Sequence, residues 1–203
     1  MRFAILGGSF DPVHNGHLRL AEAVRDRFGY DAVILVPANR SPQKSVRPVA
    51  GPQERLAMVR LAVQGHSALK VSDVELRRGG TSYTVDTVEQ LAEELSPEAR
   101  PGLVIGADLA EGFSKWRRSS DLLALAQLIV VDRPGFNGAL EWPHATIRGL
   151  TMTESSSEIR QRIAGGEPWE SMVPSPVVRF IVEHSLYTDH EGHSAVVQER
   201  PNA

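Results

Sequence analysis

Short, continuous apolar runs recur along the chain and predict buried strands. They cover residues 3–6, 32–36, 103–105 and 128–131. The runs lack the alternation of polar and apolar residues that a half-exposed strand shows, so both faces of each strand are expected to be covered. Residues 70–76 are predicted to form a further strand or strand pair.

Amphipathic helices are predicted between and after these runs. Apolar residues recur there at spacings of three and four, which places them on one face of a helix. The helical segments begin near Gly16, Pro52, Thr84, Ser155 and Val177. Pro52 suits a first helical turn, Thr84 is a candidate cap, and Gly29 is placed to end the first helix.

The alternation of strands and helices predicts the α/β class, as a Rossmann-like, doubly wound parallel sheet with helices on both faces. One domain is expected over residues 1–188, followed by a disordered tail over residues 189–203, which lack periodicity. In such sheets ligands bind beyond the carboxyl ends of the strands, where the strand order reverses. The residues that follow each strand are therefore the candidates for a site.

Composition and charge exclude several classes of function. The chain has 203 residues, a formal net charge of -3 at pH 7 and no cysteine. It therefore lacks the basic excess of a nucleic-acid-binding protein, and disulfides, thiol catalysis and cysteine-bound metals are excluded. No apolar run approaches the roughly 18 residues that span a membrane, and the apolar N-terminal run is too short for a signal peptide. A cytoplasmic protein without nucleic-acid or membrane partners is expected.

The first predicted strand leads into a motif that predicts a polyphosphate site. Residues 7–18 read Gly-Gly-Ser-Phe-Asp-Pro-Val-His-Asn-Gly-His-Leu, so His14 and His17 flank Gly16 where a helix begins. Glycines let a ligand approach the backbone, and the N–H groups and dipole of a helix N-terminus attract an anion. The motif is neither a Walker loop nor the dinucleotide-binding fingerprint. Metal binding by both histidines and a purely structural role are the alternatives.

The pattern Gly-x-Phe-x-Pro-x-His-x-Gly-His resembles the motif of the nucleotidyltransferase superfamily named for its His-x-Gly-His sequence. Over nearly the whole chain, the sequence is similar to the bacterial nicotinate-nucleotide adenylyltransferases. The supporting segments are residues 82–87, 105–108, 116, 132–135 and 155–160. The resemblance implies an enzyme of NAD biosynthesis that transfers the adenylyl group of ATP to nicotinate mononucleotide and releases pyrophosphate.

The resemblance also implies roles for individual residues. The implied catalytic residues are His14, His17, Lys44 and Arg160. ATP binding is implied for Gly7, Gly8, Ser9, Phe10, His14, Gly16, His17, Gly106, Asp108, Arg133, Ser156, Ser157 and Arg160. Acceptor binding is implied for Ser82, Tyr83, Thr84 and Trp116. Mg²⁺ is expected to bind mainly through the ATP phosphates, with no metal ligands from the protein.

Several alternatives stay open from the sequence. Nicotinamide mononucleotide and phosphopantetheine are other acceptors within the superfamily, cytidylyl transfer is a related activity, and a nucleotide-binding sensor without turnover is a rival of another class. Two departures from the family pattern motivate these alternatives. Gln43 stands before Lys44 where the family commonly has histidine, and it offers phosphate only a neutral contact. Glu154 replaces an apolar residue and would repel phosphate if it pointed inward.

The supporting residues could also have ordinary structural roles, and the sequence does not determine the oligomeric state. Packing, capping, surface ion pairing and solvation are the plainer roles for Trp116, Thr84, Asp108, Arg133 and Arg160. ATP and nicotinate mononucleotide are the expected partners, and a homo-oligomer is compatible with the sequence.

Overall fold

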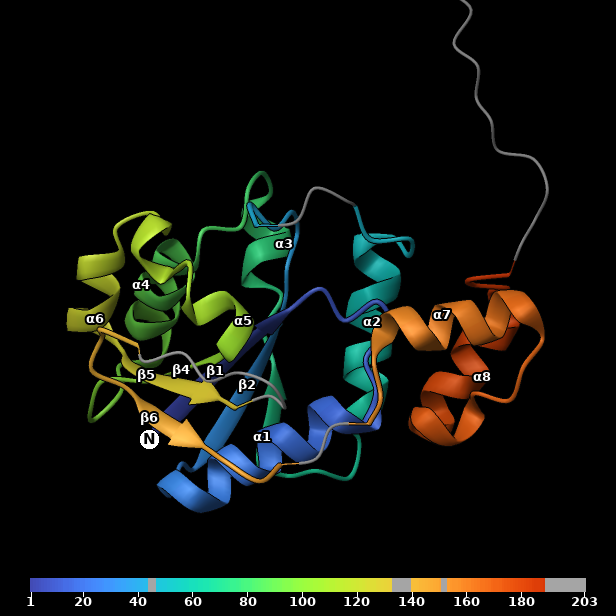
Figure 1. Cartoon of the computed structure of the whole chain (residues 1–203), viewed down its shortest axis with the longest axis horizontal. Coiled ribbons are helices and arrows are strands. Elements are labelled where there is room, and N and C mark those ends of the chain that lie inside the picture. The colour runs from blue at the N-terminus through green and yellow to red at the C-terminus, as the bar shows by residue number, and fades with distance from the viewer. Residues whose placement is uncertain (44–46, 133–139, 151–152, 189–203) are drawn as a thin grey trace, which may run out of the picture.

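The structure is a computed structural model, and it describes residues 1–43, 47–132, 140–150 and 153–188 (Figure 1). The strands are β1 (Phe3–Gly8), β2 (Ala32–Pro37), β3 (Leu69–Val71), β4 (Gly102–Gly106), β5 (Gln127–Val131) and β6 (Ala145–Ile147). The α-helices are α1 (Asn15–Phe28), α2 (Pro52–Ala62), α3 (Val74–Arg78), α4 (Thr84–Leu95), α5 (Ala107–Ala110), α6 (Ser119–Leu125), α7 (Ser156–Gly165) and α8 (Ser175–Glu183). Two 3-10 turns add η1 (Phe113–Lys115) and η2 (Glu170–Met172).

The described strands form one parallel sheet in the order β3-β2-β1-β4-β5-β6. Strand β1 pairs with β2 on one side and with β4 on the other, with Leu6 opposite Leu35 and Val104. The chain builds the sheet outward from β1 in one direction and from β4 in the other. This order confirms the predicted Rossmann-like fold, and its switch point lies between β1 and β4.

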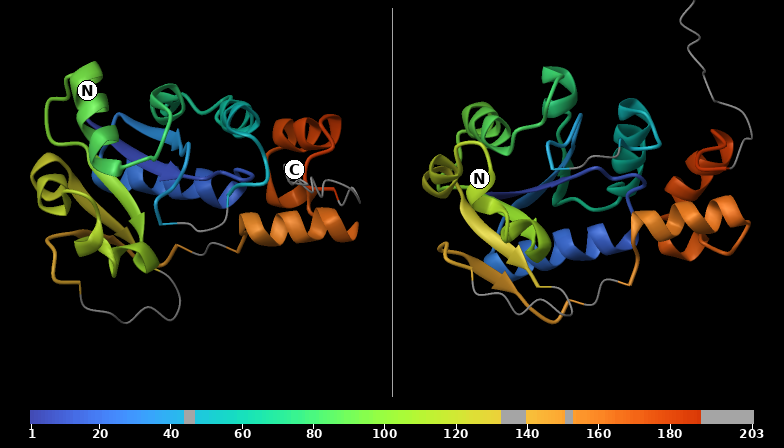
Figure 2. Two further views of the ribbon diagram at one scale, coloured as in Figure 1. Left: turned by 90° about the horizontal axis from the view of Figure 1, so that it is seen from above. Right: turned by 45° about the horizontal axis from the view of Figure 1, so that its top comes forward.

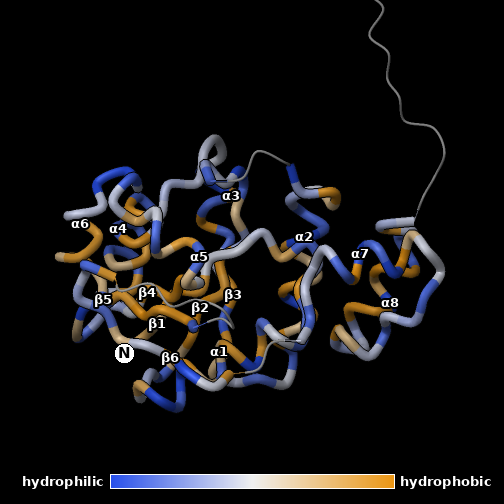
Figure 3. Tube along the Cα trace, viewed as in Figure 1, coloured by the Kyte–Doolittle hydropathy of each residue, from blue (hydrophilic) through white to orange (hydrophobic). Residues whose placement is uncertain are grey.

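The sheet is covered on both faces, as its apolar runs predict. Alternate residues of β1 enter two different cores. Ala4 and Leu6 belong to the core that α1, α2, α7 and α8 cover, whereas Phe3 and Ile5 belong to the core under α3, α4, α5 and α6. Figure 3 shows the strands as a hydrophobic centre with the polar sides of the helices outside. The amphipathic helices therefore hold the sheet by burying one stripe each.

Local predictions agree with the structure at several element ends and fail at others. Gly29 ends α1 with a φ of 65°, as predicted. Residues 70–76, predicted as a strand or strand pair, contain the end of β3 and the start of α3, whose Glu75 is buried. Tyr83, and not Thr84, is the N-cap residue of α4, and its side chain makes no capping hydrogen bond. The three-residue strand β6 was too short to show periodicity in the sequence.

Helices α7 and α8 lie together at one end of the sheet, on the side of α2 (Figures 1 and 2). Helix α8 packs on α2, and the start of α7 lies against the loop after β1 through hydrogen bonds to Asp11 and Pro12. The predicted tail over residues 189–203 is outside the described residues. No described helix is long and apolar enough to cross a bilayer.

Candidate active site

The loop between β1 and α1 leaves backbone open to a ligand beside the switch point. Gly7 is exposed, and a β-carbon there would meet no atom within 4 Å. A β-carbon on Gly8 would instead lie 3.1 Å from the Phe10 ring. Phe10 is buried with a φ of 49°, and Ser9 between them accepts a hydrogen bond through its carbonyl. A ligand can therefore approach Gly7, while Phe10 supports the loop from inside.

The ring of His17 is oriented as a hydrogen-bond donor. Its Nδ1 accepts the backbone N–H of His14 at 3.2 Å, and the His17 N–H donates to the His14 carbonyl at 3.0 Å. Because a backbone N–H can only donate, the proton of a neutral His17 ring must lie on Nε2. The ring packs between Phe10 and His14, with ring centroids 4.9 and 3.7 Å away. Both ring orientation and tautomer are therefore determined by the N-terminus of α1.

His14 is buried beneath His17, with 5% of its surface exposed. Within the described part of the chain, its Nδ1 has no hydrogen-bond partner. Burial lowers the pKa of His14 to about 4, while Glu154 opposes this shift and Arg19 adds to it. His14 is thus neutral at neutral pH, and an anion bound beside it would favour its protonated form. Gly16 leaves the room that His14 needs, because a β-carbon there would lie 3.0 Å from Nδ1.

Helix α7 brings a second helix N-terminus to the same loop. The Ser156 hydroxyl donates to the Pro12 carbonyl at 2.9 Å, and Arg160 Nη1 donates to the Asp11 carbonyl at 2.7 Å. Ser157 is exposed in the first turn of the helix. The structure therefore places the first turns of α7 against the loop that carries the two histidines, although the two segments are distant in sequence. Two helix N-termini at one loop favour binding of a highly charged anion.

A buried polar network supports the histidine loop, and sequence reasoning missed it. The Asp11 carboxylate accepts two backbone N–H groups of residues 49–50 at 2.8 and 3.0 Å, and the Tyr187 hydroxyl at 2.9 Å. Arg55 is 1% exposed and donates to the Ser9 carbonyl at 2.7 Å. Two features of the sequence could have indicated this network. Asp11 lies inside the motif, and Arg55 is a charged residue in a helix stripe that is otherwise apolar. The network joins the loop to α2 and to the end of the described chain.

Glu154 lies near the histidines, but Arg19 neutralises its charge. Both carboxylate oxygens contact the Arg19 guanidinium, and Nη1 donates to Oε1 at 2.9 Å. These hydrogen bonds lower the pKa of Glu154 to about 2. Its Oε2 would lie 3.4 Å from a β-carbon on Gly16, which places the ion pair at the first turn of α1. The repulsion of phosphate expected from Glu154 is therefore offset by a paired cation.

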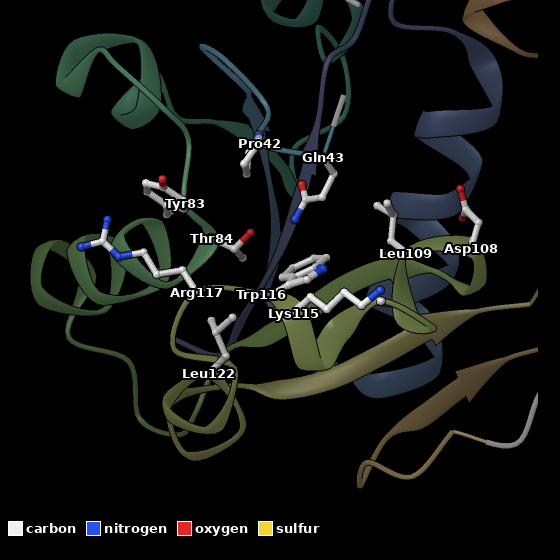
Figure 4. A pocket seen from close by; sticks show the side chains of 11 residues that line it. Pro42, Gln43, Tyr83, Thr84, Asp108, Leu109, Lys115, Trp116, Arg117 and Leu122 are labelled. Carbon is white, nitrogen blue, oxygen red and sulfur yellow. The ribbon is translucent and has the colours of Figure 1, made fainter. Parts of the chain in front are cut away.

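A pocket of about 560 Å³ opens beyond the carboxyl end of β4 (Figure 4). Its lining residues are Pro42, Gln43, Tyr83, Thr84, Asp108, Leu109, Gly112, Lys115, Trp116, Arg117 and Leu122. Three residues predicted for the acceptor, Tyr83, Thr84 and Trp116, thus come together in one cavity. Trp116 is half-buried and packs on Phe113 with ring centroids 5.4 Å apart. Trp116 therefore packs on the core with one part of its ring and lines the pocket with another.

Ser82 lies behind this pocket and is absent from its lining. Its buried hydroxyl accepts the Asn39 N–H at 2.9 Å, and its own N–H donates to the Arg40 carbonyl at 2.8 Å. Nearby, the buried Glu75 accepts the Thr87 hydroxyl at 2.7 Å, and burial raises the pKa of the Glu75 carboxyl. The Ser82 contacts connect the segment after β2 to the residues before α4, and the Glu75 contact connects α3 to α4, so together they support the wall that carries Tyr83.

The remaining predicted residues fall into two groups. Gly106 ends β4, and Asp108 lies in the first turn of α5 and lines the pocket (Figure 4). Lys44 and Arg133 lie outside the described residues, so their phosphate contacts stay predictions.

Lys115 and Arg117 also line the pocket, although the sequence did not predict them. Basic residues near a helix start ordinarily belong to a solvated surface.

Comparison with known proteins identifies the family. The model of the cytidylyltransferase-like family matches residues 5–162. A probable nicotinate-nucleotide adenylyltransferase of Symbiobacterium thermophilum is 37% identical over 95% of this chain and 98% of its own. A relative of the same name from Bacillus pumilus is 38% identical over 92% and 98% of the two chains.

The fold agrees with that of solved structures. The nicotinic acid mononucleotide adenylyltransferase of Plasmodium falciparum, complexed with NaAD, is 19% identical and has a TM-score of 0.74, with 92% of this chain and 97% of that chain covered. At this identity the similarity supports the fold, and the curated relatives carry the narrower assignment. The chain therefore belongs to the cytidylyltransferase-like family and, within it, to the nicotinate-nucleotide adenylyltransferases.

Proposed function

We propose that this chain transfers the adenylyl group of ATP to nicotinate mononucleotide, giving nicotinate adenine dinucleotide and pyrophosphate. The observation that carries the proposal is the pairing of two sites at one switch point. The histidine loop follows β1, and the pocket with Tyr83 and Trp116 follows the adjacent strand β4. A phosphate group held at the loop and an acceptor held in the pocket would meet above the boundary between these strands.

The reaction needs positioning more than it needs a general base. An oxygen of the acceptor 5′-phosphate attacks the α-phosphorus of ATP, the bond from that phosphorus to the bridging oxygen breaks, and pyrophosphate leaves with the electron pair. A phosphate monoester has a second pKa near about 6, so the nucleophile is largely dianionic at neutral pH. The protein must therefore align the phosphates and neutralise the charge that develops on the leaving group.

The histidine loop supplies groups suited to that task. We assign the Nε2–H of His17 to the α-phosphate and the leaving pyrophosphate, because its tautomer is already set. His14 lies beneath it and gains affinity for a proton when phosphate binds nearby. The start of α7, with Ser157 and Arg160, is assigned to the outer phosphates. Lys44 is proposed as a further phosphate contact from the segment after β2.

Mg²⁺ is proposed to enter with ATP. Among the described residues, no group of three or more His, Asp or Glu side chains could hold a metal ion. Hard divalent cations prefer phosphate and water oxygens, and Mg²⁺ often keeps several waters. When bound, the ion would add charge neutralisation on the triphosphate. The described side chains then have to orient a metal-bound substrate and need not hold the ion themselves.

The pocket is assigned to nicotinate mononucleotide. Tyr83 and Trp116 offer aromatic faces for the pyridinium ring, and the first turn of α4 offers backbone N–H groups near Thr84. An acceptor that carries a carboxylate matches these donors, whereas a carboxamide presents N–H groups to some of them. Mismatches of this kind discriminate strongly in a buried site. We therefore expect nicotinate mononucleotide to be preferred over nicotinamide mononucleotide.

Pyrophosphate release is the measurement that tests this function. Wild-type protein is incubated with ATP, Mg²⁺ and either nicotinate mononucleotide, nicotinamide mononucleotide or phosphopantetheine. Fast release with nicotinate mononucleotide supports the proposal, and release only with another acceptor would reassign the pocket. Binding of ATP by calorimetry without release from any acceptor would contradict the catalytic function and favour a sensor.

Two broader expectations accompany the proposal. The cytoplasm is the proposed compartment, because ATP is the proposed substrate. Homo-oligomerisation stays a prediction, and light scattering after size-exclusion chromatography would measure the mass in solution. Neither expectation enters the chemistry above.

A further inference from the structure

Arg117 is a cation in the pocket wall, and the reaction proposed above assigns it no role. Its guanidinium carbon lies 4.5 Å from the centroid of the Tyr83 ring, and its side chain is exposed. Within the described residues, no carboxylate forms an ion pair with Arg117. The neighbouring Arg118 is different, because it pairs with Glu89 at 2.7 Å and with Asp121 at 2.6 Å. Two consecutive arginines thus have different environments, and only the first lines the pocket.

The pocket has a direction that separates its two ends. Asp108 follows β4, the strand that pairs with β1, and the end of β1 leads into the histidine loop. In Figure 4, Lys115 lies between Asp108 and Trp116. Tyr83 and Arg117 lie at the opposite end. An acceptor with its 5′-phosphate toward His17 would pass Trp116 and place its ring substituent toward Tyr83 and Arg117.

We propose that Arg117 binds the carboxylate of the acceptor and is a specificity-determining residue for nicotinate over nicotinamide mononucleotide. This inference rests on the proposed function and names the group that reads the ring substituent. The guanidinium presents several N–H donors in one plane, a geometry that matches a carboxylate. Because the guanidinium already stacks on Tyr83, the Arg117 side chain loses less conformational entropy when the acceptor binds.

The same guanidinium would also weaken the binding of nicotinamide mononucleotide, which carries a carboxamide in place of the carboxylate. The pyridinium ring carries a positive charge, which the carboxylate of nicotinate balances and the carboxamide of nicotinamide does not. A cation at this end of the pocket therefore attracts the first acceptor and disfavours the second. Specificity arises from both the attraction and the repulsion.

The test compares the two acceptors in three variants. Arg117→Gln removes the charge, Arg117→Lys keeps the charge without the planar donors, and Arg118→Gln is the matched control from outside the pocket. The readout is the ratio of kcat/KM for nicotinate mononucleotide to that for nicotinamide mononucleotide. We expect Arg117→Gln to lower this ratio about tenfold, the effect of one charge-assisted hydrogen bond in a partly exposed site. Arg117→Lys should have an intermediate ratio, and Arg118→Gln should match the wild type.

The outcomes separate this inference from simpler roles. An unchanged ratio in Arg117→Gln would overturn it. An equal loss with both acceptors would overturn it too, because it would mean that Arg117 contacts the common 5′-phosphate or only supports the Tyr83 wall. Circular dichroism and ATP calorimetry confirm that each variant is folded and binds ATP. Failure of the proposed function would look different, because the wild-type protein itself would then use neither acceptor.

Discussion

Lowering the pH from 7 to 5 is expected to destabilise the protein through His14. The pKa of this ring is about 4 in the folded chain and 6.5 in the reference state, because burial opposes its charge. Between these values the unfolded chain binds a proton that the folded chain does not, so stability rises with pH across this window. At pH 5 the cost relative to pH 7 is about 2 kcal/mol. For a chain of this size that corresponds to a fall in Tm of about 4–8 °C.

His14→Gln isolates this contribution, because glutamine keeps polar atoms at the site but does not titrate. Urea unfolding followed by circular dichroism at pH 7 and pH 5 measures the free energy of unfolding of both proteins. The loss between the two pH values should be smaller by about 2 kcal/mol in the variant. Glu154 does not enter this window, since its pKa of about 2 means that its stabilising charge is lost only as the pH falls below 4.5.

His144→Gln is the matched control, because its ring is exposed and its Nδ1 lies 2.6 Å from the Trp142 backbone carbonyl. It removes one histidine without touching the buried site. If wild type and His14→Gln lose the same free energy between pH 7 and pH 5, then His14 is not held neutral by burial. The assignment of His14 as a neutral side chain in the free site would then be wrong.

Three further predictions follow from the site. His17→Ala should lower kcat by about 10²–10³-fold with an unchanged circular dichroism spectrum, because it removes a donor to developing charge, and wild-type turnover in the folded variant would refute this role. Tyr187→Phe should lower the free energy of unfolding by about 1–2 kcal/mol in urea, since it removes a buried hydrogen bond to Asp11, and an unchanged midpoint would contradict the support network. Arg19→Met should raise the KM for ATP by about threefold and Glu154→Ala should lower it, because each leaves one charge of the pair beside the phosphates; equal KM values in both variants would show that the pair does not face ATP.

The family motif and the strands could be predicted from the sequence, because each depends on residues that are adjacent in the chain. A buried parallel strand is apolar along its whole length, so the runs that become β1, β2, β4 and β5 are visible without any partner. The His-x-Gly-His segment was readable for a related reason. A strand end, glycines and a helix start are adjacent in sequence, and their N–H groups converge wherever that local structure forms.

Short elements and capping positions were less readable. Helix α3 has five residues and β6 has three, and neither length allows a period to be recognised. The start of α4 was misplaced by one residue, because a threonine is a frequent cap while the chain here uses Tyr83 without a side-chain cap. Local propensity was overridden in these places by contacts with other elements.

The sequence by itself determined the fold class and the family motif with His14 and His17, because these are patterns of residues that are close in sequence. Only the tertiary structure decided which distant residues act together. It placed α7 against the histidine loop, paired Glu154 with Arg19 and joined Asp11 to Tyr187, although 176 positions separate the last two. It also separated Arg117 from Arg118, which the sequence presents as one basic pair. The physical reason is that burial and charge pairing depend on distance in space, and sequence order does not encode that distance directly.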